Sequence, residues 1–496
     1  MTLTPAELSA LLPLLIPALG ACLLPIAALD SDQATVKWIR AAMFFIALLA
    51  LAGGFFFLTR LWATGAQPVF GALRMDRLAQ FGGIFVLVAA ALTVLQLWDH
   101  LHQEGWVKGE TLSLLLFSVV GMMLFTATSN LLLLFLGLEL LSLPLYALTA
   151  TVRTRSQAME AGMKYFLTGA VASASFLMGA VLLYGATGSL DASVIGHLLA
   201  PAGGPLDPIA LVGAALLLVG FLFKLSAVPF HQWTPDVYEA APTPIAGFMS
   251  VATKGVAILA LLRIMALALP VMGSRLQAAV AVLAVLTLVL GNLAALAQPN
   301  VKRMLAYSSI SHAGYLLLGF VAGTPGAHVG ILFYLLAYLA MNLGAFGVLT
   351  AFGLVGDQTT FEHLRGLGWK RPGVGIAACL CMFSLAGLPP MAGFYGKYMI
   401  FKELILQGHV GLAVVGVLAS LVSVYYYLRL PVALFIEKPS EAAERDAAER
   451  PRALAPFAGA TVLVCGLLVV LMGLFPGTVV ATFARRAVQE TTNFLP

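Results

Sequence analysis

The chain has 496 residues, of which 61% are hydrophobic and only 10% are charged. Soluble domains carry about 25% charged residues, so this composition excludes a soluble enzyme and indicates an integral membrane protein made of helices. The net charge of +5 comes from residues spread over the loops, with no basic stripe interleaved with aromatics, and this excludes a nucleic-acid-binding surface.

Hydropathy predicts about fourteen membrane-spanning helices, because the apolar runs reach the length of about 20 residues that crosses roughly 30 Å of hydrocarbon. The first run is expected to be a retained helix and not a signal peptide, since no Lys or Arg precedes it. The most polar connection, 437–452, is expected to be a solvated segment. The predicted spans are 8–28, 38–60, 78–98, 110–127, 130–151, 158–184, 207–231, 244–267, 277–297, 301–322, 327–354, 374–403, 410–435 and 455–483.

The basic residues of the loops predict the orientation of the chain. Fifteen of them fall in loops that follow odd-numbered spans, from Lys37 to Arg452, and eight fall on the other side, from Arg60 to Arg486. Cytoplasmic loops carry an excess of Lys and Arg. We therefore expect the richer side to face the cytoplasm and both termini to lie outside it.

A short sequence motif that occurs twice predicts a repeated architecture. Residues 223–229 read FKLSAVP and residues 383–389 read FSLAGLP, so that Phe, Leu and Pro recur at an offset of 160. Each copy lies in a span broken by proline, the seventh and the twelfth. The offset covers five spans, and an odd repeat unit reverses its orientation in the membrane, as in inverted-repeat transporters.

The expected fold class is therefore an all-α integral membrane protein with about fourteen transmembrane helices, two inverted five-helix repeats and broken helices 7 and 12. A wet, polar cavity is expected at each break, because backbone groups freed by proline need partners in lipid. The predicted units are 1–109 for the first three helices, 110–267 and 277–435 for the two repeats, and 436–496 for a cytoplasmic connection and the last helix.

Five ionisable residues lie within the apolar spans: Glu139, Lys164, Lys224, Lys254 and Lys397. Such a group at bilayer depth costs roughly 2.5–3.5 kcal/mol on insertion scales and marks an ion or proton path by default. Glu139 and Lys224 are each other's most plausible counter-ion, while Lys254 has no acid nearby in its span. Lys164 lies nearer the end of its span and can instead extend its ammonium to the interface.

Other polar residues extend this set. His231 follows Lys224 by seven residues and titrates near neutrality, so it can pass protons onward or simply cap the broken helix. His312 joins three serines within a span, either to hold water or to bond across helices. Asp236 and Glu239 lie in a Pro-rich loop that is either an aqueous mouth or a partner contact.

Several chemistries are excluded because the motifs that they need are absent from the sequence. The four cysteines lie in apolar segments, with no spacing that suits zinc or an iron–sulfur cluster. The sequence holds no GxxxxGK[ST] loop and no HExxH, and single histidines in separate spans do not make a pair of haem ligands. We expect no metal site, no cofactor site and no bond-making chemistry in this chain alone.

Three blocks carry a family resemblance: FKLSAVPFHQWTPDVYEAAPTP at 223–244, NVKRMLAYSSISH at 300–312 and GLPPMAGFYGK at 387–397. They closely resemble signatures of the antiporter-like membrane subunits of respiratory complex I, and the resemblance runs over nearly the whole chain. Ala240 replaces the glycine expected in the first block. The chain ends at Pro496 without a long lateral helix, so we expect one of the shorter siblings and not the largest.

The resemblance implies roles for residues already singled out. Glu139 and Lys224 correspond to the paired acid and lysine at the broken helix, Lys254 to the central lysine and Lys397 to the distal site. His231 matches a bridging histidine and Lys164 a further lysine of the sixth span. The resemblance implies an electrostatic proton relay driven by quinone reduction elsewhere in the complex.

The resemblance also implies that FMN, iron–sulfur clusters and quinone are bound by partner subunits, and that the partners of this chain are other membrane subunits and lipid. Two alternatives follow from the sequence. The chain could be a subunit of a multi-subunit cation/proton antiporter or of a membrane-bound hydrogenase, which share the lysines. It could also be a structural spacer of the membrane arm.

Overall fold

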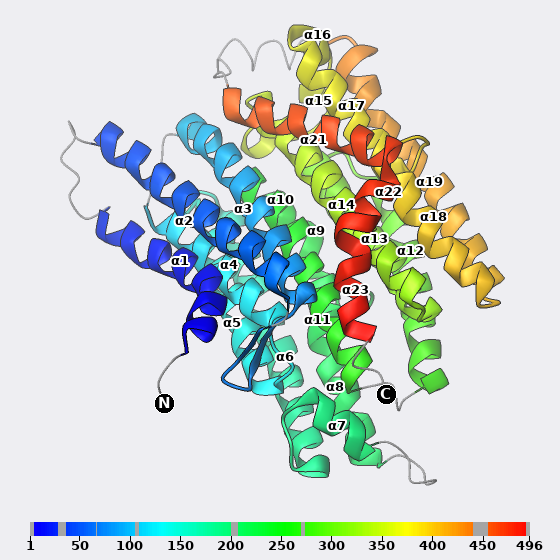
Figure 1. The fold of residues 1–496 in the computed structure, drawn as a ribbon. Helices are drawn as coiled ribbons and strands as arrows, with labels where there is room; N and C mark the ends of the chain where they lie inside the picture. Colours follow the sequence, from blue (N-terminus) through cyan, green and yellow to red (C-terminus); the bar gives the residue numbers. More distant parts are fainter. Residues whose placement is uncertain are drawn as a thin grey trace.

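The computed structural model describes residues 4–27, 36–65, 67–104, 109–199, 207–268, 273–439 and 455–492. Within these ranges, thirteen helices are long and apolar enough to cross a membrane, and they run side by side as one bundle (Figure 1). They are α1 (Pro5–Ala27), α2 (Val36–Thr64), α3 (Arg77–Glu104), α4 (Gly109–Thr126), α5 (Leu131–Thr149), α6 (Ser156–Thr187), α8 (Pro208–Leu225), the continuous α10–η1–α11 (Thr243–Phe248, Met249–Thr253, Lys254–Leu267), α12 (Gly273–Leu296), α13 (Val301–Ala322), α14 (Pro325–Ala351), α19 (Val410–Phe435) and α21 (Pro456–Leu474).

The all-α membrane fold is confirmed, and one predicted span differs in form. The run 374–403 is two helices of 15 residues each, α17 (Pro372–Ala386) and α18 (Ala392–Leu406), separated by the Pro389-Pro390 pair. The last predicted span also ends early, at Leu474, because Pro476 starts a new turn. Residues 440–452 of the polar connection and Pro496 lie outside the described residues.

Short elements that hydropathy did not predict complete the described part of the chain. Most are connections between spanning helices, and the last three follow α21. They are the antiparallel hairpin β1 (Gln67–Val69) and β2 (Leu73–Met75), α7 (Ala192–Leu199), α9 (Trp233–Ala240), η3 (Gly356–Gln358), α15 (Phe361–Leu364), α16 (Leu367–Lys370), α22 (Pro476–Val479), η4 (Val480–Ala484) and α23 (Arg485–Thr492).

The two helix breaks have the same backbone hydrogen bonds. At the first, α8 ends at a left-handed Ser226 and the N–H of Ala227 donates to Leu222 O at 2.9 Å. At the second, α17 ends at a left-handed Gly387 and the N–H of Leu388 donates to Phe383 O at 3.0 Å. The equivalent residues are thus 161 apart in the chain, 226 with 387 and 227 with 388. The offset of 160 read from the sequence is wrong by one residue, since it aligned side chains and not the helix cap.

A second local pattern also occurs twice. Asn130 caps α5 through its side-chain oxygen, which accepts from Leu132 N and Leu133 N, and Asn300 caps α13 in the same way. The first N–H of each helix also donates to a loop carbonyl, Leu131 to Leu190 and Val301 to Thr359, both at 2.8 Å. Each helix start is therefore tied to the loop that follows the next helix.

A buried ion pair joins three helices at one end of the bundle. Arg263 on α11 donates from both terminal nitrogens to Asp76, at 2.6 and 2.7 Å, and one of them also donates to Thr126 O of α4. Both side chains are only 2% exposed. Asp76 immediately precedes α3 and accepts from Ala79 N, so it caps that helix while it neutralises Arg263. One carboxylate therefore holds α3, α4 and α11 together.

Asp76→Asn is expected to destabilise the protein strongly, because it removes the charge and leaves Arg263 buried without a counter-ion. The expected loss is about 3–5 kcal/mol. The measurement is the thermal unfolding midpoint of the purified assembly in detergent. The control is Glu437→Gln, which breaks the half-exposed Arg365–Glu437 pair and should lose less than about 1 kcal/mol. Equal midpoints for the two variants would contradict the assignment.

Candidate functional site

Three of the predicted lysines lie inside the bundle. Lys224, Lys254 and Lys397 are 2%, 1% and 4% exposed, and they come from α8, α11 and α18. Glu139 on α5 is half-buried. An ammonium group removed from water needs acceptors or counter-charges in the protein, so the surroundings of each lysine decide what it can do.

The ammonium of Lys224 is surrounded by aromatic rings. It lies in the last turn of α8, just before the helix break, with Nζ at 5.3–5.4 Å from the ring centres of Tyr146, Tyr165 and Phe223. The negative faces of such rings attract a cation. Among the described residues, no hydrogen-bond acceptor contacts this Nζ. Lys224 is thus held by weak, non-directional contacts.

Glu139 acts on Lys224 from a distance. Its charge influences both Lys224 and Tyr146, which follows it by two turns on α5. Within the described residues, no carboxylate oxygen comes within 4.0 Å of Lys224 Nζ. The structure therefore brings the predicted pair into electrostatic range but not into a direct ion pair.

Lys254 is bound by a single main-chain acceptor. It follows the π-helical turn η1, and its Nζ donates to the Ser309 carbonyl of α13 at 2.7 Å. π-helical turns inside α-helices are frequent at functional sites. A neutral amine and an ammonium can both donate to a carbonyl, so this contact tolerates either protonation state.

Lys397 occupies the second helix break. Its Nζ donates to Leu385 O at 3.2 Å, Ala386 O at 3.1 Å and Ser420 Oγ at 2.8 Å, and lies 4.6 Å from the ring centre of Tyr315. The two carbonyls belong to the last turn of α17, where the partial negative charge of a helix dipole is concentrated. The helix break therefore supplies the acceptors that this lysine needs.

A polar cluster around His312 lies between Lys254 and Lys397. His312 Nδ1 is 2.5 Å from the Tyr334 hydroxyl, and Nε2 is 2.8 Å from the Tyr427 hydroxyl, which also bonds to Ser308. Ser308 adjoins the residue that binds Lys254, and the His312 ring lies beside Tyr315, whose ring faces Lys397. The sequence alone does not identify Tyr334 and Tyr427 as functional residues, because a Tyr in an apolar span is typical of a packing residue.

Several buried polar atoms near Lys224 have no hydrogen-bond partner among the described residues. They are Glu139 Oε1, Tyr146 OH, Tyr165 OH, Lys224 Nζ, His231 Nδ1 and Tyr238 OH. Buried polar atoms in proteins are nearly always bonded, to protein or to water. These atoms therefore need partners that the described residues do not supply, and the polar cavity expected at this break stays a prediction.

His231 and Lys164 lie away from these lysine contacts. His231 is half-buried in the connection between α8 and α9, where it is reached by the charge of Lys254. Lys164 has a side chain that is 39% exposed, and its Nζ is 2.5 Å from Asp236 and 3.8 Å from Glu160. Lys164 therefore belongs to an outer network of charges and not to the buried set.

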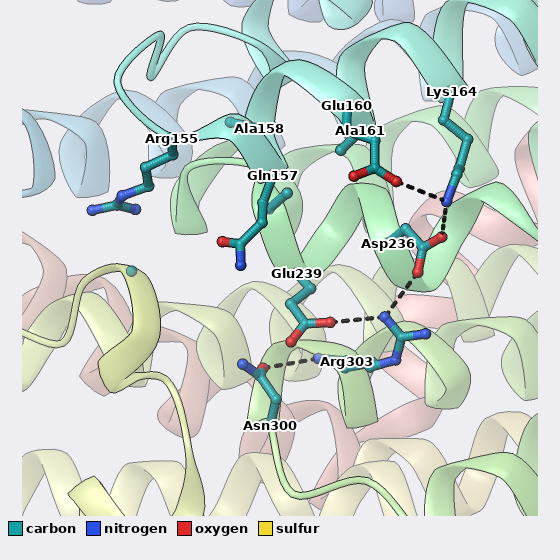
Figure 2. A pocket seen from close by; sticks show the side chains of 12 residues that line it. Arg155, Gln157, Ala158, Glu160, Ala161, Lys164, Asp236, Glu239, Asn300 and Arg303 are labelled. Carbon is teal, nitrogen blue, oxygen red and sulfur yellow. Dashed lines mark hydrogen bonds and ion pairs between the residues drawn. The ribbon is translucent and has the colours of Figure 1, made fainter.

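That outer network lines a cavity of about 280 Å³ between α6, α9 and α13. In Figure 2 the side chains of Lys164 and Arg303 approach Asp236 from two directions. Arg303 donates at 2.8 Å both to Asp236 and to Glu239. Burial alone would raise the pKa of the Asp236 carboxyl, but hydrogen bonds from Lys164 and Arg303, together with their charges, lower it below its ordinary value.

Metal chemistry finds no support in the part of the chain that the structure describes, where no three His, Cys, Asp or Glu side chains are grouped to hold an ion. All four cysteines are free thiols. The functional groups of the site are amines, carboxylates, imidazoles and hydroxyls, which take and release protons.

The chain was compared with known families and proteins. The transmembrane family described as NADH:quinone oxidoreductase/Mrp antiporter matches residues 128–423. A relative named NADH-quinone oxidoreductase subunit N, from Trichlorobacter lovleyi, is 42% identical over 445 residues, which are 90% of each chain. The chain belongs to this family. Among solved structures, a chain of respiratory complex I from Thermus thermophilus is 39% identical, with a TM-score of 0.79 over 95% of this chain and 99% of that one.

A more distant solved structure has the same fold as this chain. A chain of the Mrp complex from a Dietzia species has a TM-score of 0.84 at 21% identity and covers all of both chains, so it shows the shared fold. The segment matched by the family contains Glu139, Lys224, Lys254 and Lys397, both helix breaks and both Asn caps. The resemblance inferred from three sequence blocks is confirmed.

The lowered pKa of Asp236 predicts a pH-dependent contribution to stability. A carboxyl whose pKa is lowered on folding stabilises the protein above the ordinary Asp value near 3.9, and this stabilisation is lost as the pH falls through the folded value. The thermal midpoint of Asp236→Asn should therefore lie below that of the wild type at pH 7, and the difference should shrink as the pH falls below about 4.

The matched control is Glu160→Gln, which removes the longer and more exposed contact to Lys164. It should leave the midpoint nearly unchanged at both pH values. An Asp236→Asn difference that stayed constant from pH 7 to pH 3 would show that the ion pairs do not cause the shift.

Proposed function

We propose that this chain is an N-type, proton-translocating membrane-arm subunit of a bacterial NADH:quinone oxidoreductase. The observation that carries the proposal is the set of three lysines that are at most 4% exposed and are bound by carbonyls, hydroxyls and aromatic rings. Its relatives named NADH-quinone oxidoreductase subunit N support the assignment to this complex. The chain itself carries out the proton transfer and no redox step.

The relay begins at Glu139 and Lys224. Lys224 lies among rings without a bonded acceptor, so its charge responds to any change in the field of Glu139. At an effective dielectric constant near 20, two unit charges 4 Å apart interact by about 4 kcal/mol. An interaction of this size moves a pKa by a few units. A change in charge near Glu139, driven by quinone reduction in a partner subunit, thus shifts the proton between sites.

The polar groups between Lys254 and Lys397 support a proton route between these lysines, and its central part, from Ser308 through Tyr427 to His312, is hydrogen-bonded. Lys254 binds Ser309 O, Ser308 binds Tyr427, and Tyr427 binds His312. Hydroxyls and a neutral imidazole both donate and accept, so they can pass a proton by exchanging hydrogen bonds. Lys397, held by the carbonyls at the end of α17, releases it outward. His231 is assigned to the step between Lys224 and Lys254, which is supported by its place after the α8 break and by the influence of the Lys254 charge on it.

The domain division and the orientation belong to the same proposal. The duplicated helix caps and breaks support two five-helix repeats, 110–267 and 277–435, of opposite orientation. The distribution of basic residues supports cytoplasmic loops after odd-numbered spans, with both termini outside. Partners would be neighbouring membrane subunits and lipid, and FMN, iron–sulfur clusters and quinone would be bound by other subunits.

Lys254→Met tests the relay directly. The substitution keeps the length of the side chain but removes the proton-carrying amine, and proton pumping coupled to NADH oxidation should fall by roughly 10²-fold, the contribution of a positioned proton-transfer group. The measurement is the pH gradient formed by the purified complex in liposomes. Lys402→Met, an exposed lysine on the same helix as Lys397, is the control and should pump normally.

The same experiment separates the alternatives. Normal pumping by an intact Lys254→Met complex would favour a structural spacer. Co-purification of the chain with small antiporter subunits, without flavin or iron–sulfur proteins, would favour a cation/proton antiporter. The 42% identity to an oxidoreductase subunit, against 21% to a chain of an Mrp complex, favours the first assignment.

His312→Phe is expected to interrupt the route between the second pair of lysines. The substitution keeps an aromatic ring but loses both nitrogens that bind Tyr334 and Tyr427. Pumping should fall as in Lys254→Met while the assembled complex keeps its mass. Tyr307→Phe, on the same helix and outside this cluster, should be neutral. Unchanged pumping in His312→Phe would remove the histidine from the route.

A further inference from the structure

The charged cavity beside α9 is large enough to hold water and open to one side of the bundle. Its volume of about 280 Å³ gives room for several water molecules, each of which occupies about 30 Å³ in the liquid. Its lining comes from α6, α9, the start of α13 and the loops at Arg155 and Gly356 (Figure 2). These loops follow odd-numbered spans, the side that the basic residues assign to the cytoplasm.

Asp236 is shared between two cations that each have a second acid. Lys164 of α6 contacts Asp236 at 2.5 Å and Glu160 at 3.8 Å. Arg303 of α13 contacts Asp236 and Glu239, both at 2.8 Å. Protonation of Asp236 therefore leaves Lys164 paired with Glu160 and Arg303 paired with Glu239. Neither cation loses its last counter-ion. The other titratable and charged groups that line the cavity are Arg155, Glu160, Lys164, Glu239 and Arg303, and of these Lys164 and Arg303 contact Asp236.

One helix connects this cavity to Lys224. Asp236 follows Trp233 by three residues on α9, so the two side chains lie on neighbouring positions of that helix. The Trp233 ring stacks on Tyr165 with a centroid distance of 4.3 Å and an interplanar angle of 8°. Tyr165 in turn lies 5.4 Å from Lys224 Nζ, and it adjoins Lys164 in the chain. The stacked rings thus contact Lys224 through Tyr165, and they belong to the same helices as the cavity residues Asp236 and Lys164.

We propose that this cavity is the mouth through which the chain takes up protons, with Asp236 as the first acceptor and the Trp233–Tyr165 stack as the barrier in front of Lys224. The proposal rests on the proposed function and deepens it by naming the uptake site. It assigns a role to Lys164 as well: it positions Asp236 and does not itself relay the proton.

The step balances in atoms and charge. A proton from cavity water forms an O–H bond on the Asp236 carboxylate, which loosens its contacts to Lys164 and Arg303. Transfer inward breaks that O–H bond and forms an N–H bond on a neutral Lys224, with water carrying the proton past the rings. The carboxylate is then restored and pairs again with the two cations.

Asp236→Asn tests this role in the purified complex reconstituted in liposomes, where external NADH drives only the complexes whose NADH site faces out. NADH-driven proton uptake should fall roughly tenfold. Millimolar azide, a small weak acid, should restore it, because hydrazoic acid can carry protons to the cavity without the carboxylate. Asp236→Glu, which keeps an acid, should retain most of the uptake.

The matched control is Glu437→Gln, which removes an acid from a half-exposed ion pair on the same side of the bundle but outside the cavity. Its uptake should be normal and insensitive to azide. Full uptake by Asp236→Asn would overturn the proposal, and so would a loss that azide does not restore, since the latter indicates a purely structural ion pair.

Lys254→Met distinguishes this failure from a failure of the proposed function. If Lys254→Met loses pumping while Asp236→Asn pumps normally, the relay stands and the mouth lies elsewhere. If Lys254→Met pumps normally, the proposed function itself fails, and the cavity is left without the role assigned to it.

Discussion

The arrangement of this protein follows from the free energy of placing an amine inside a helical bundle. A regular helix offers such an amine few acceptors, because its carbonyls are already bonded within the helix. Lys254 shares one such carbonyl, that of Ser309 within α13, whereas Lys397 binds the carbonyls of Leu385 and Ala386 in the last turn of α17. Lys397 lies at the end of α17, Lys224 in the last turn before the other break, and Lys254 directly after a π-helical turn. The irregularities of the backbone and the buried charges therefore occur together.

The three lysines are nevertheless held in different ways. Lys397 has three oxygen acceptors, Lys254 has one, and Lys224 has rings and the field of Glu139. The number of strong contacts to the ammonium thus increases from α8 to α18. A group with few fixed contacts changes its charge state readily, whereas one with many resists the change. Lys224 is therefore the lysine whose charge state responds most readily to the field of Glu139.

Much of this could be predicted from the sequence, and the exceptions have physical reasons. Apolar runs and prolines predict the spanning helices and both breaks, because burial in lipid and the missing proline N–H act locally. The contacts of Tyr334 and Tyr427 with His312 could not be predicted, because a tyrosine in a membrane helix can equally be a packing residue. The ion pair of Lys164 could not be predicted either, because its partner Asp236 is 72 residues away in the chain. The one-residue error in the repeat offset arose because side chains and helix caps need not align.

α13 is hydrogen-bonded to the segment from α9 to α11 at two levels along its axis. Lys302 donates to the carbonyls of Glu239 and Ala241 just before α10, and Ser309, two turns further along, accepts from Lys254. A sliding or tilting of α10–α11 against α13 would have to break both attachments at once. The geometry therefore favours a rigid frame in which only side chains and protons move. In the proposed relay, such a frame would couple the lysines through the electrostatic field and not through helix movement.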